Sequence, residues 1–176
     1  MTSTELKSVL ATILAPATFV TTLAWSDTAR AKTADRGQPM IINSDSTNCN
    51  VTANGHCHHR GNVEINQGTL EIRADTAEVQ KRNGEIHRII FTGRQATLEQ
   101  QLEDNTWTNA RADRIDYKLS DNLVVLTGNY QVSSIQGTTT GQKMVYNVLT
   151  GEIRSGGDGT RVRTVIMPKD SRPPNR

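Results

Sequence analysis

The sequence predicts an all-β protein with many antiparallel strands, and three observations support this prediction. No proline occurs in the 128 residues from 40 to 167, whereas 12 of the 13 glycines lie there. Proline removes a backbone donor from a sheet, and glycine permits the positive φ of hairpin turns. In the same stretch apolar residues occupy every second position, which is typical of strands with one apolar and one polar face.

Composition narrows the class of protein further. Hydrophobic residues make up 35% of the chain and aromatic residues only 4%, which excludes collagen-like, coiled-coil and multi-span membrane proteins. The length of 176 residues fits one domain with flanking segments. The net charge is only +2 and no aromatic platform accompanies a basic region, so we expect no nucleic-acid partner.

The N-terminus has the layout of a secretory signal. Residues 9–25 are apolar and uncharged, Lys7 precedes them, and Ala29 and Ala31 form an A-x-A cleavage pattern. We therefore expect a signal peptide over 1–31, with a single membrane anchor as the alternative, because 9–25 is at the short limit for crossing a bilayer. After the signal peptide we expect a flexible linker at 32–36, a β domain at 37–168 and a disordered basic tail at 169–176.

Cys49 and Cys57 are the only cysteines, and in an exported protein such a pair is a disulfide candidate. The Asn54-Gly55 dipeptide between them signals a hairpin turn. A strict two-residue turn would pair Cys49 with Arg60 and point the two sulfur atoms to opposite faces. The disulfide therefore requires a longer or shifted turn.

Three histidines surround the second cysteine, at positions 56, 58 and 59, and Cys and His side chains are common zinc ligands. The only other histidine is His87, so no second ligand cluster is visible. Neighbouring strand residues also alternate faces, which separates His58 from His59. We expect no metal site and a polar, solvent-facing hairpin.

The body contains a repeated pattern of a strand, a turn and a second strand, which indicates stacked β units. Asp75 and Asp113 recur in it just before the second strand, and we expect them to bond local backbone amides rather than to catalyse a reaction. Asn83-Gly84 and Thr150-Gly151 are further turn signals. The paired segments are 61–65 with 74–79, 93–98 with 112–117, and 128–132 with 141–146.

The alternation also selects one apolar face of the sheet. Such a face forms either the closed core of a sandwich or a groove that accepts an apolar ligand, and the pattern does not separate the two. Its residues are Met40, Ile42, Val63, Ile65, Leu70, Ile72, Val79, Leu98, Ile115, Tyr117, Leu119, Val124, Leu126, Tyr130, Val132, Met144, Tyr146 and Val148.

No catalytic constellation is visible in the sequence. No serine has a nucleophile-elbow context, no glycine-rich phosphate loop occurs, and no histidine is placed as a general base. We therefore expect no catalytic residues, no cofactor and no enzymatic activity.

Several short motifs resemble the LptA family of periplasmic lipopolysaccharide-transport proteins, which carry the OstA-like domain. They are QPMIINSD at 38–45, QGTL at 67–70 and LVVLTGN at 123–129, together with 61–63, 74–75 and 141–143. The resemblance covers roughly residues 37–168. It implies a twisted, open β-jellyroll that stacks head-to-tail, with its first strand near Met40 and Ile42 and its last near 162–167.

The same resemblance implies a function and partners. The protein would carry lipopolysaccharide across the periplasm, with the acyl chains of lipid A in a groove lined by the eighteen apolar residues. Its partners would be an LptC-like inner-membrane protein, an LptD-like outer-membrane protein and further copies of itself. The segment 47–60, with its cysteines and histidines, is outside the family pattern and leaves the register of that hairpin open.

Two alternatives remain at this stage. One is a membrane-anchored jellyroll of the same pathway, similar to LptC, which would retain the N-terminal segment. The other is a secreted carbohydrate-binding β-sandwich, for which Trp107 is the only candidate aromatic.

Overall fold

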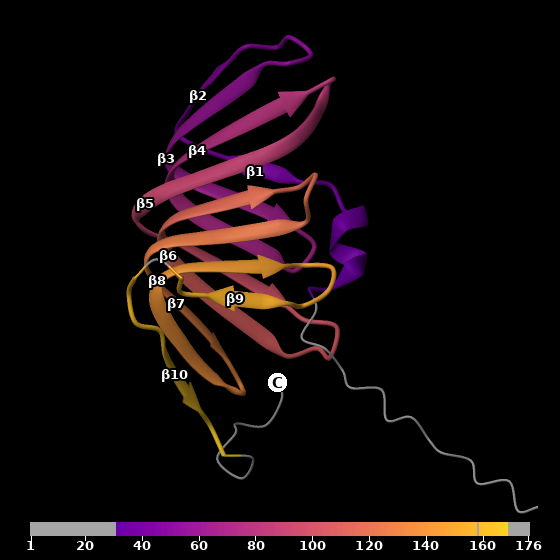
Figure 1. Cartoon of the computed structure of the whole chain (residues 1–176). Helices are drawn as coiled ribbons and strands as arrows, with labels where there is room; N and C mark the ends of the chain where they lie inside the picture. The colour runs from indigo at the N-terminus through magenta and orange to yellow at the C-terminus, as the bar shows by residue number, and fades with distance from the viewer. Residues whose placement is uncertain (1–30, 158, 169–176) are drawn as a thin grey trace, which may run out of the picture.

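The computed structural model describes residues 31–157 and 159–168, and these form one ten-stranded antiparallel sheet. The all-β prediction is thus confirmed, whereas the signal at 1–30 and the tail at 169–176 lie outside the described residues. Figure 1 shows the sheet twisting from β2 to β10. Its strands are β1 (Ile41–Asn43), β2 (Ser46–Cys49), β3 (His56–Gln67), β4 (Leu70–Arg82), β5 (Glu85–Gln101), β6 (Trp107–Lys118), β7 (Leu123–Ser134), β8 (Gly137–Asn147), β9 (Ile153–Ser155) and β10 (Arg163–Ile166).

The strands form a meander, and each edge of the sheet consists of two short strands that pair with different parts of one long strand. The strand order is β1-β3-β4-β5-β6-β7-β8-β10, and β2 and β9 pair with the remaining lengths of β3 and β8. β1 and β2 thus form one edge of the sheet, and β9 and β10 form the other. Pro39 lies just before β1 and Pro168 just after β10, so the two prolines flank the sheet.

The long strands bend near their middle, where the pairing register shifts. The shifts lie at 60–63, 73–76, 92–96, 111–114 and 127–130, which form a seam across the sheet. A β-bulge bends its strand and increases the local twist. The seam therefore divides one continuous sheet into two walls that face each other.

The seam corrects the interpretation of the repeat. Its glycines were expected to begin strands, but Gly61 and Gly128 lie inside β3 and β7 with φ of 74° and 79°. The following Asn62 and Asn129 also have positive φ. These bulges and tight hairpin turns both place glycine and asparagine at positive φ, so the two produce the same sequence signal.

The recurring aspartates stabilise this seam across strands rather than within their own turns. Asp75 Oδ2 accepts a hydrogen bond from the backbone N of Arg94 at 3.1 Å, and Asp113 Oδ2 accepts one from Asn129 Nδ2 at 3.1 Å. A Cβ on Gly128 would lie 2.4 Å from Asp113 Oδ2. The prediction of a structural role fits these contacts, but the expected partners within the same turn were wrong.

The segment expected to be a flexible linker contains a short 3-10 helix, η1 (Thr33–Gly37). Asp35 in this helix is buried, and its Oδ2 accepts a hydrogen bond from Thr69 Oγ1 at 2.5 Å. A Cβ on Gly68 would lie 2.2 Å from Asp35 Oδ1, so glycine makes room for the carboxylate. These tertiary contacts explain the difference, because the short polar sequence alone has no helical signal. Within the described residues no helix is long and apolar enough to span a membrane.

An ion pair on the outer face joins β5 to β6. Arg88 donates from Nε to Asp116 Oδ1 at 2.8 Å and from Nη2 to Asp116 Oδ2 at 2.5 Å. Burial raises the pKa of the Asp116 carboxyl, but the hydrogen bond and charge of Arg88, helped by Arg114 and Lys118, outweigh it and lower that pKa. The carboxylate is therefore stabilised in the folded state.

We expect Asp116→Asn to lower the free energy of unfolding by about 1–2 kcal/mol at neutral pH, because a charged hydrogen-bonded pair is lost. The folded pKa is below the unfolded one, so the contribution is full above pH of about 4 and is lost as pH falls toward the folded value. Urea unfolding across this range measures the difference. The control Glu71→Gln removes a more exposed partner of Arg73 and should cost under about 1 kcal/mol. If the difference in unfolding free energy between wild type and Asp116→Asn stays constant down to low pH, the ion pair of Arg88 with Asp116 does not stabilise the fold.

Candidate functional site

The inner faces of the two walls carry all eighteen apolar residues selected from the alternation. They belong to one hydrophobic cluster, which confirms that they share a face. Eleven are buried: Val63, Ile65, Leu70, Ile72, Val79, Ile115, Val124, Leu126, Tyr130, Met144 and Val148. Seven pack against them and are half-buried: Met40, Ile42, Leu98, Tyr117, Leu119, Val132 and Tyr146. Whether they bind a ligand stays a prediction.

The interior differs between its two ends. Toward β3 and β4 the walls touch, and Val63, Ile65 and Ile72 are at most 1% exposed. Toward β7, β8 and β10 the walls separate around a cavity of about 350 Å³. The sequence left open whether the apolar face forms a closed core or a groove. The structure has a closed core toward β3 and β4 and a groove toward β7, β8 and β10.

The cavity is lined mainly by apolar side chains from β5 to β10. Seven of the eighteen selected residues contribute: Leu98, Val124, Leu126, Val132, Met144, Tyr146 and Val148. Leu102, Ala110, Ile153, Val165 and Ile166 add apolar surface that the selection omitted, and Thr108, Thr138, Thr139 and Thr164 add hydroxyls. A cavity of this size and lining is typical of a site for an apolar ligand.

Sequence reasoning also missed two large core residues, Ile89 and Phe91. Both are 0% exposed and oppose Val79 and Ala77 on β4. Ile90 lies between them on the outer face, opposite Glu78 and Asp116, and is itself buried. Three consecutive apolar residues, 89–91, hide the period-two pattern in this part of β5. The pairing of Ile89 with Val79 identifies which of them face inward.

Tyrosines place hydroxyl groups inside this apolar interior. Burial raises the pKa of both Tyr117 and Tyr146. The Tyr146 hydroxyl accepts a hydrogen bond from the backbone N of Ala31 at 3.1 Å. The Tyr130 hydroxyl is buried and finds no partner among the described residues. Tyr146 also lines the cavity, so its hydroxyl adds a weakly polar point there, and its raised pKa keeps that hydroxyl neutral.

The N-terminal segment connects the rims of the two walls. Ala31 forms a β-bridge with Leu102, and Gln67 Nε2 donates to the Gln38 carbonyl at 3.1 Å. Between these points Arg36 donates to Asn122 Oδ1 at 3.2 Å. Figure 1 shows the short helix η1 beside the hairpin turns at one side of the sheet. Residues 31–38 therefore cross the open side of the interior.

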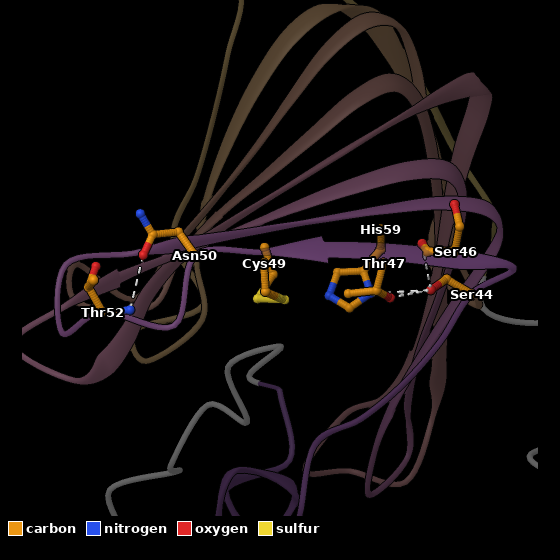
Figure 2. The surroundings of a disulfide bond; sticks show 8 residues. Ser44, Ser46, Thr47, Cys49, Asn50, Thr52 and His59 are labelled. Carbon is orange, nitrogen blue, oxygen red and sulfur yellow. Dashed lines mark hydrogen bonds between the residues drawn. A yellow bond between two sulfur atoms is a disulfide. The ribbon is translucent and has the colours of Figure 1, made fainter.

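The hairpin of β2 and β3 contains the disulfide Cys49–Cys57, shown in Figure 2. The register pairs Cys49 directly with Cys57, with a Cα separation of 4.0 Å. The disulfide candidate and the longer turn that it requires are both confirmed, because residues 50–55 form the loop between β2 and β3. Asn50 Oδ1 accepts from Thr52 N at 3.1 Å, and Lys81 N donates to the Gly55 carbonyl at 2.9 Å, so the loop is held locally and against β4.

The histidines of this hairpin divide between its faces. The rings of His56 and His58 lie on the outer face with centroids 5.0 Å apart, and His59 lies on the inner face with Cys57. Burial lowers the pKa of His59, and the nearby His58 adds to this. With the disulfide closed, the described residues contain no group of three His, Cys, Asp or Glu side chains able to hold a metal.

The fold and the cavity together define the class of this protein: an open β-jellyroll whose two walls enclose an apolar groove. A family model for the LptA/LptD N-terminal domain of lipopolysaccharide-transport proteins matches residues 41–152. The chain belongs to this family.

Characterised relatives are similar over most of their length. The lipopolysaccharide export system protein LptA of Escherichia coli (strain K12) is 33% identical over 149 residues, covering 83% of this chain and 80% of that protein. LptH of Pseudomonas aeruginosa, an export system protein of the same kind, is 29% identical over 154 residues, covering 82% and 87%.

A solved structure has the same fold. It is LptH, described as the LptA homologous periplasmic component of the conserved lipopolysaccharide transport device from Pseudomonas aeruginosa. Its TM-score is 0.69 at 26% identity, and the match covers 76% of this chain and 99% of that one. The open jellyroll expected from the sequence is confirmed by this similarity. These relatives are named as lipopolysaccharide export and transport proteins.

Proposed function

We propose that this protein is a periplasmic, non-enzymatic carrier that binds lipopolysaccharide with acyl chains in the groove between its walls. The observation that carries the proposal is the apolar cavity of about 350 Å³ in a chain of this family. Burial of an acyl chain stabilises the complex by about 0.8 kcal/mol per CH₂ group. The charged and sugar parts of the ligand would stay outside, in water.

The edges of the sheet support a bridging role. β1 and β2 form one edge and β9 and β10 the other, and each edge strand offers backbone groups for further pairing. Large apolar side chains are exposed at both edges, with Ile41 at 56% and Ile166 at 76%. We propose that copies stack head-to-tail through these edges, between an LptC-like inner-membrane partner and an LptD-like outer-membrane partner.

A photoreactive residue at Val132 tests the groove. Val132 lines the cavity and is only half-buried, so the substitution leaves the packed end of the core intact. We expect ultraviolet irradiation of living cells to crosslink this position to lipopolysaccharide, which immunoblotting against lipid A detects.

The matched control is the same residue at Gln131, the neighbour on the outer face. Gln131 Oε1 accepts a hydrogen bond from Arg111 Nη2 at 2.7 Å, away from the cavity. The control position should give only background labelling. Equal labelling at the two positions, or none at Val132, would overturn the groove as the binding site.

A further inference from the structure

Three potential zinc ligands lie on one face of the β2–β3 hairpin, although the disulfide prevents them from acting together. Cys49 opposes Cys57, and two residues further along the hairpin Thr47 opposes His59. Strand residues two apart share a face and lie about 7 Å apart at Cα. In Figure 2 the sulfur atoms and the His59 ring project to the same side of the ribbon, and the imidazole lies between the disulfide and Ser44.

The His59 ring is already held in a fixed orientation. Its Nδ1 lies 3.0 Å from Thr47 Oγ1 and 3.2 Å from Ser44 Oγ. Histidines that ligate metals commonly use one ring nitrogen for the ion while a neighbouring oxygen holds the other. Here the two hydroxyls occupy Nδ1, which leaves Nε2 to face the sulfur atoms.

We propose that reduction of the Cys49–Cys57 disulfide converts this hairpin into a Zn²⁺ site with two thiolates and the His59 imidazole as ligands. In the reduction, a dithiol supplies two electrons and two protons: the bond between the two sulfurs breaks, each sulfur gains a hydrogen, and the dithiol closes into its own disulfide. Zn²⁺ then displaces the two thiol protons. Two cysteines and one histidine form a known zinc ligand set, with water completing the tetrahedron.

The hairpin can accommodate this exchange because the edge strand is lightly packed. All four residues of β2 are exposed, and β2 pairs only with β3. Cys57 also packs against the hydrophobic cluster, which anchors the β3 side of the site. The metal would therefore replace the disulfide as the link between the edge strand and the sheet, independently of the lipid groove.

The test uses the purified full chain, with and without reduction of the disulfide by a phosphine. The phosphine is oxidised to its oxide with oxygen from water, and because it is not a thiol it adds no thiolate that could bind the metal. Cobalt(II) serves as the spectroscopic probe, and zinc affinity follows from competition with a chromogenic chelator. The reduced protein should bind one ion per chain and show a thiolate-to-cobalt charge-transfer band, whereas the oxidised protein should show neither. Far-ultraviolet circular dichroism verifies that the reduced sheet remains folded.

Variants on the two faces of β3 decide the ligand set. His59→Ala should weaken zinc binding by more than about tenfold, and Thr47→Val, which removes an orienting hydroxyl, by roughly tenfold. His58→Ala, on the opposite face, should bind like wild type. The proposal is overturned if the reduced protein lacks the charge-transfer band, or if His59→Ala and His58→Ala bind zinc equally. If reduction frays the hairpin and free cysteines bind alone, His59 will have no effect, which also overturns it.

Discussion

Replacement of Phe91 by alanine should lower the free energy of unfolding by about 3–5 kcal/mol, the usual cost of deleting a buried phenyl ring. Phe91 is 0% exposed and lies between Ala77 of β4 and Ile115 of β6. Its small neighbour Ala77 cannot fill the space that the ring leaves, so a cavity would remain. Thermal unfolding of the full chain should show the midpoint falling by roughly 10–20 °C.

The matched control is Thr92→Ala, because Thr92 follows on the same strand but points outward. Its side chain is exposed, and the change should alter the free energy of unfolding by less than about 0.5 kcal/mol. Similar losses in the two variants would show that the interior near β4 and β5 is not closely packed.

The second large effect is expected at Gly137, where β8 begins beside β10. Its φ is +146°, and an added Cβ would lie 2.0 Å from the carbonyl oxygen of Val165. Gly137→Ala should therefore break the pairing of β10, whose four residues are all exposed and pair only with β8. Hydrogen exchange at the amides of 163–166 should accelerate by more than about tenfold, equivalent to roughly 1.4 kcal/mol of local stability.

Detachment of β10 has two further consequences. Val165 and Ile166 line the cavity, so one side of the groove would open, and lipopolysaccharide binding should weaken. The same strand forms an edge of the sheet, so growth of assemblies with protein concentration, measured by light scattering, should also decrease if stacking uses this edge.

Gly84→Ala is the control for backbone strain. Gly84 also has positive φ, +87°, but an added Cβ meets nothing within 4 Å. This variant should lose stability through strain alone and keep β10, the groove and the assembly intact. Equal acceleration of exchange at β10 in both variants would contradict the steric explanation.

The period-two alternation was a sound predictor of which residues share a face. It depends only on strand geometry, so it identified Val63, Leu126 and Met144 without knowledge of the topology. The turn at Asn83-Gly84 was equally clear, because both residues adopt positive φ between β4 and β5.

Features that depend on contacts between strands could not be predicted from the sequence pattern. The sequence pattern placed Gly61 and Gly128 at the start of strands, whereas both lie in bulges inside β3 and β7, and glycine at positive φ occurs in bulges as well as at strand ends. The buried Asp35 needs Thr69 and Gly68 from a distant hairpin. Likewise, β10 pairs with β8 and contributes Val165 and Ile166 to the cavity, and no local pattern encodes this placement.

The strand order also affects how the chain folds. From β3 to β8 every strand pairs with the strands next to it in sequence. Each pairing then requires closure of only a short loop, and the entropy cost of closure grows with loop length. Contacts between near neighbours favour fast folding, so we expect this sheet to form sooner than β-proteins of similar size with long crossover connections. Growth from any central hairpin would proceed outward, and the edge strands would be the last to join.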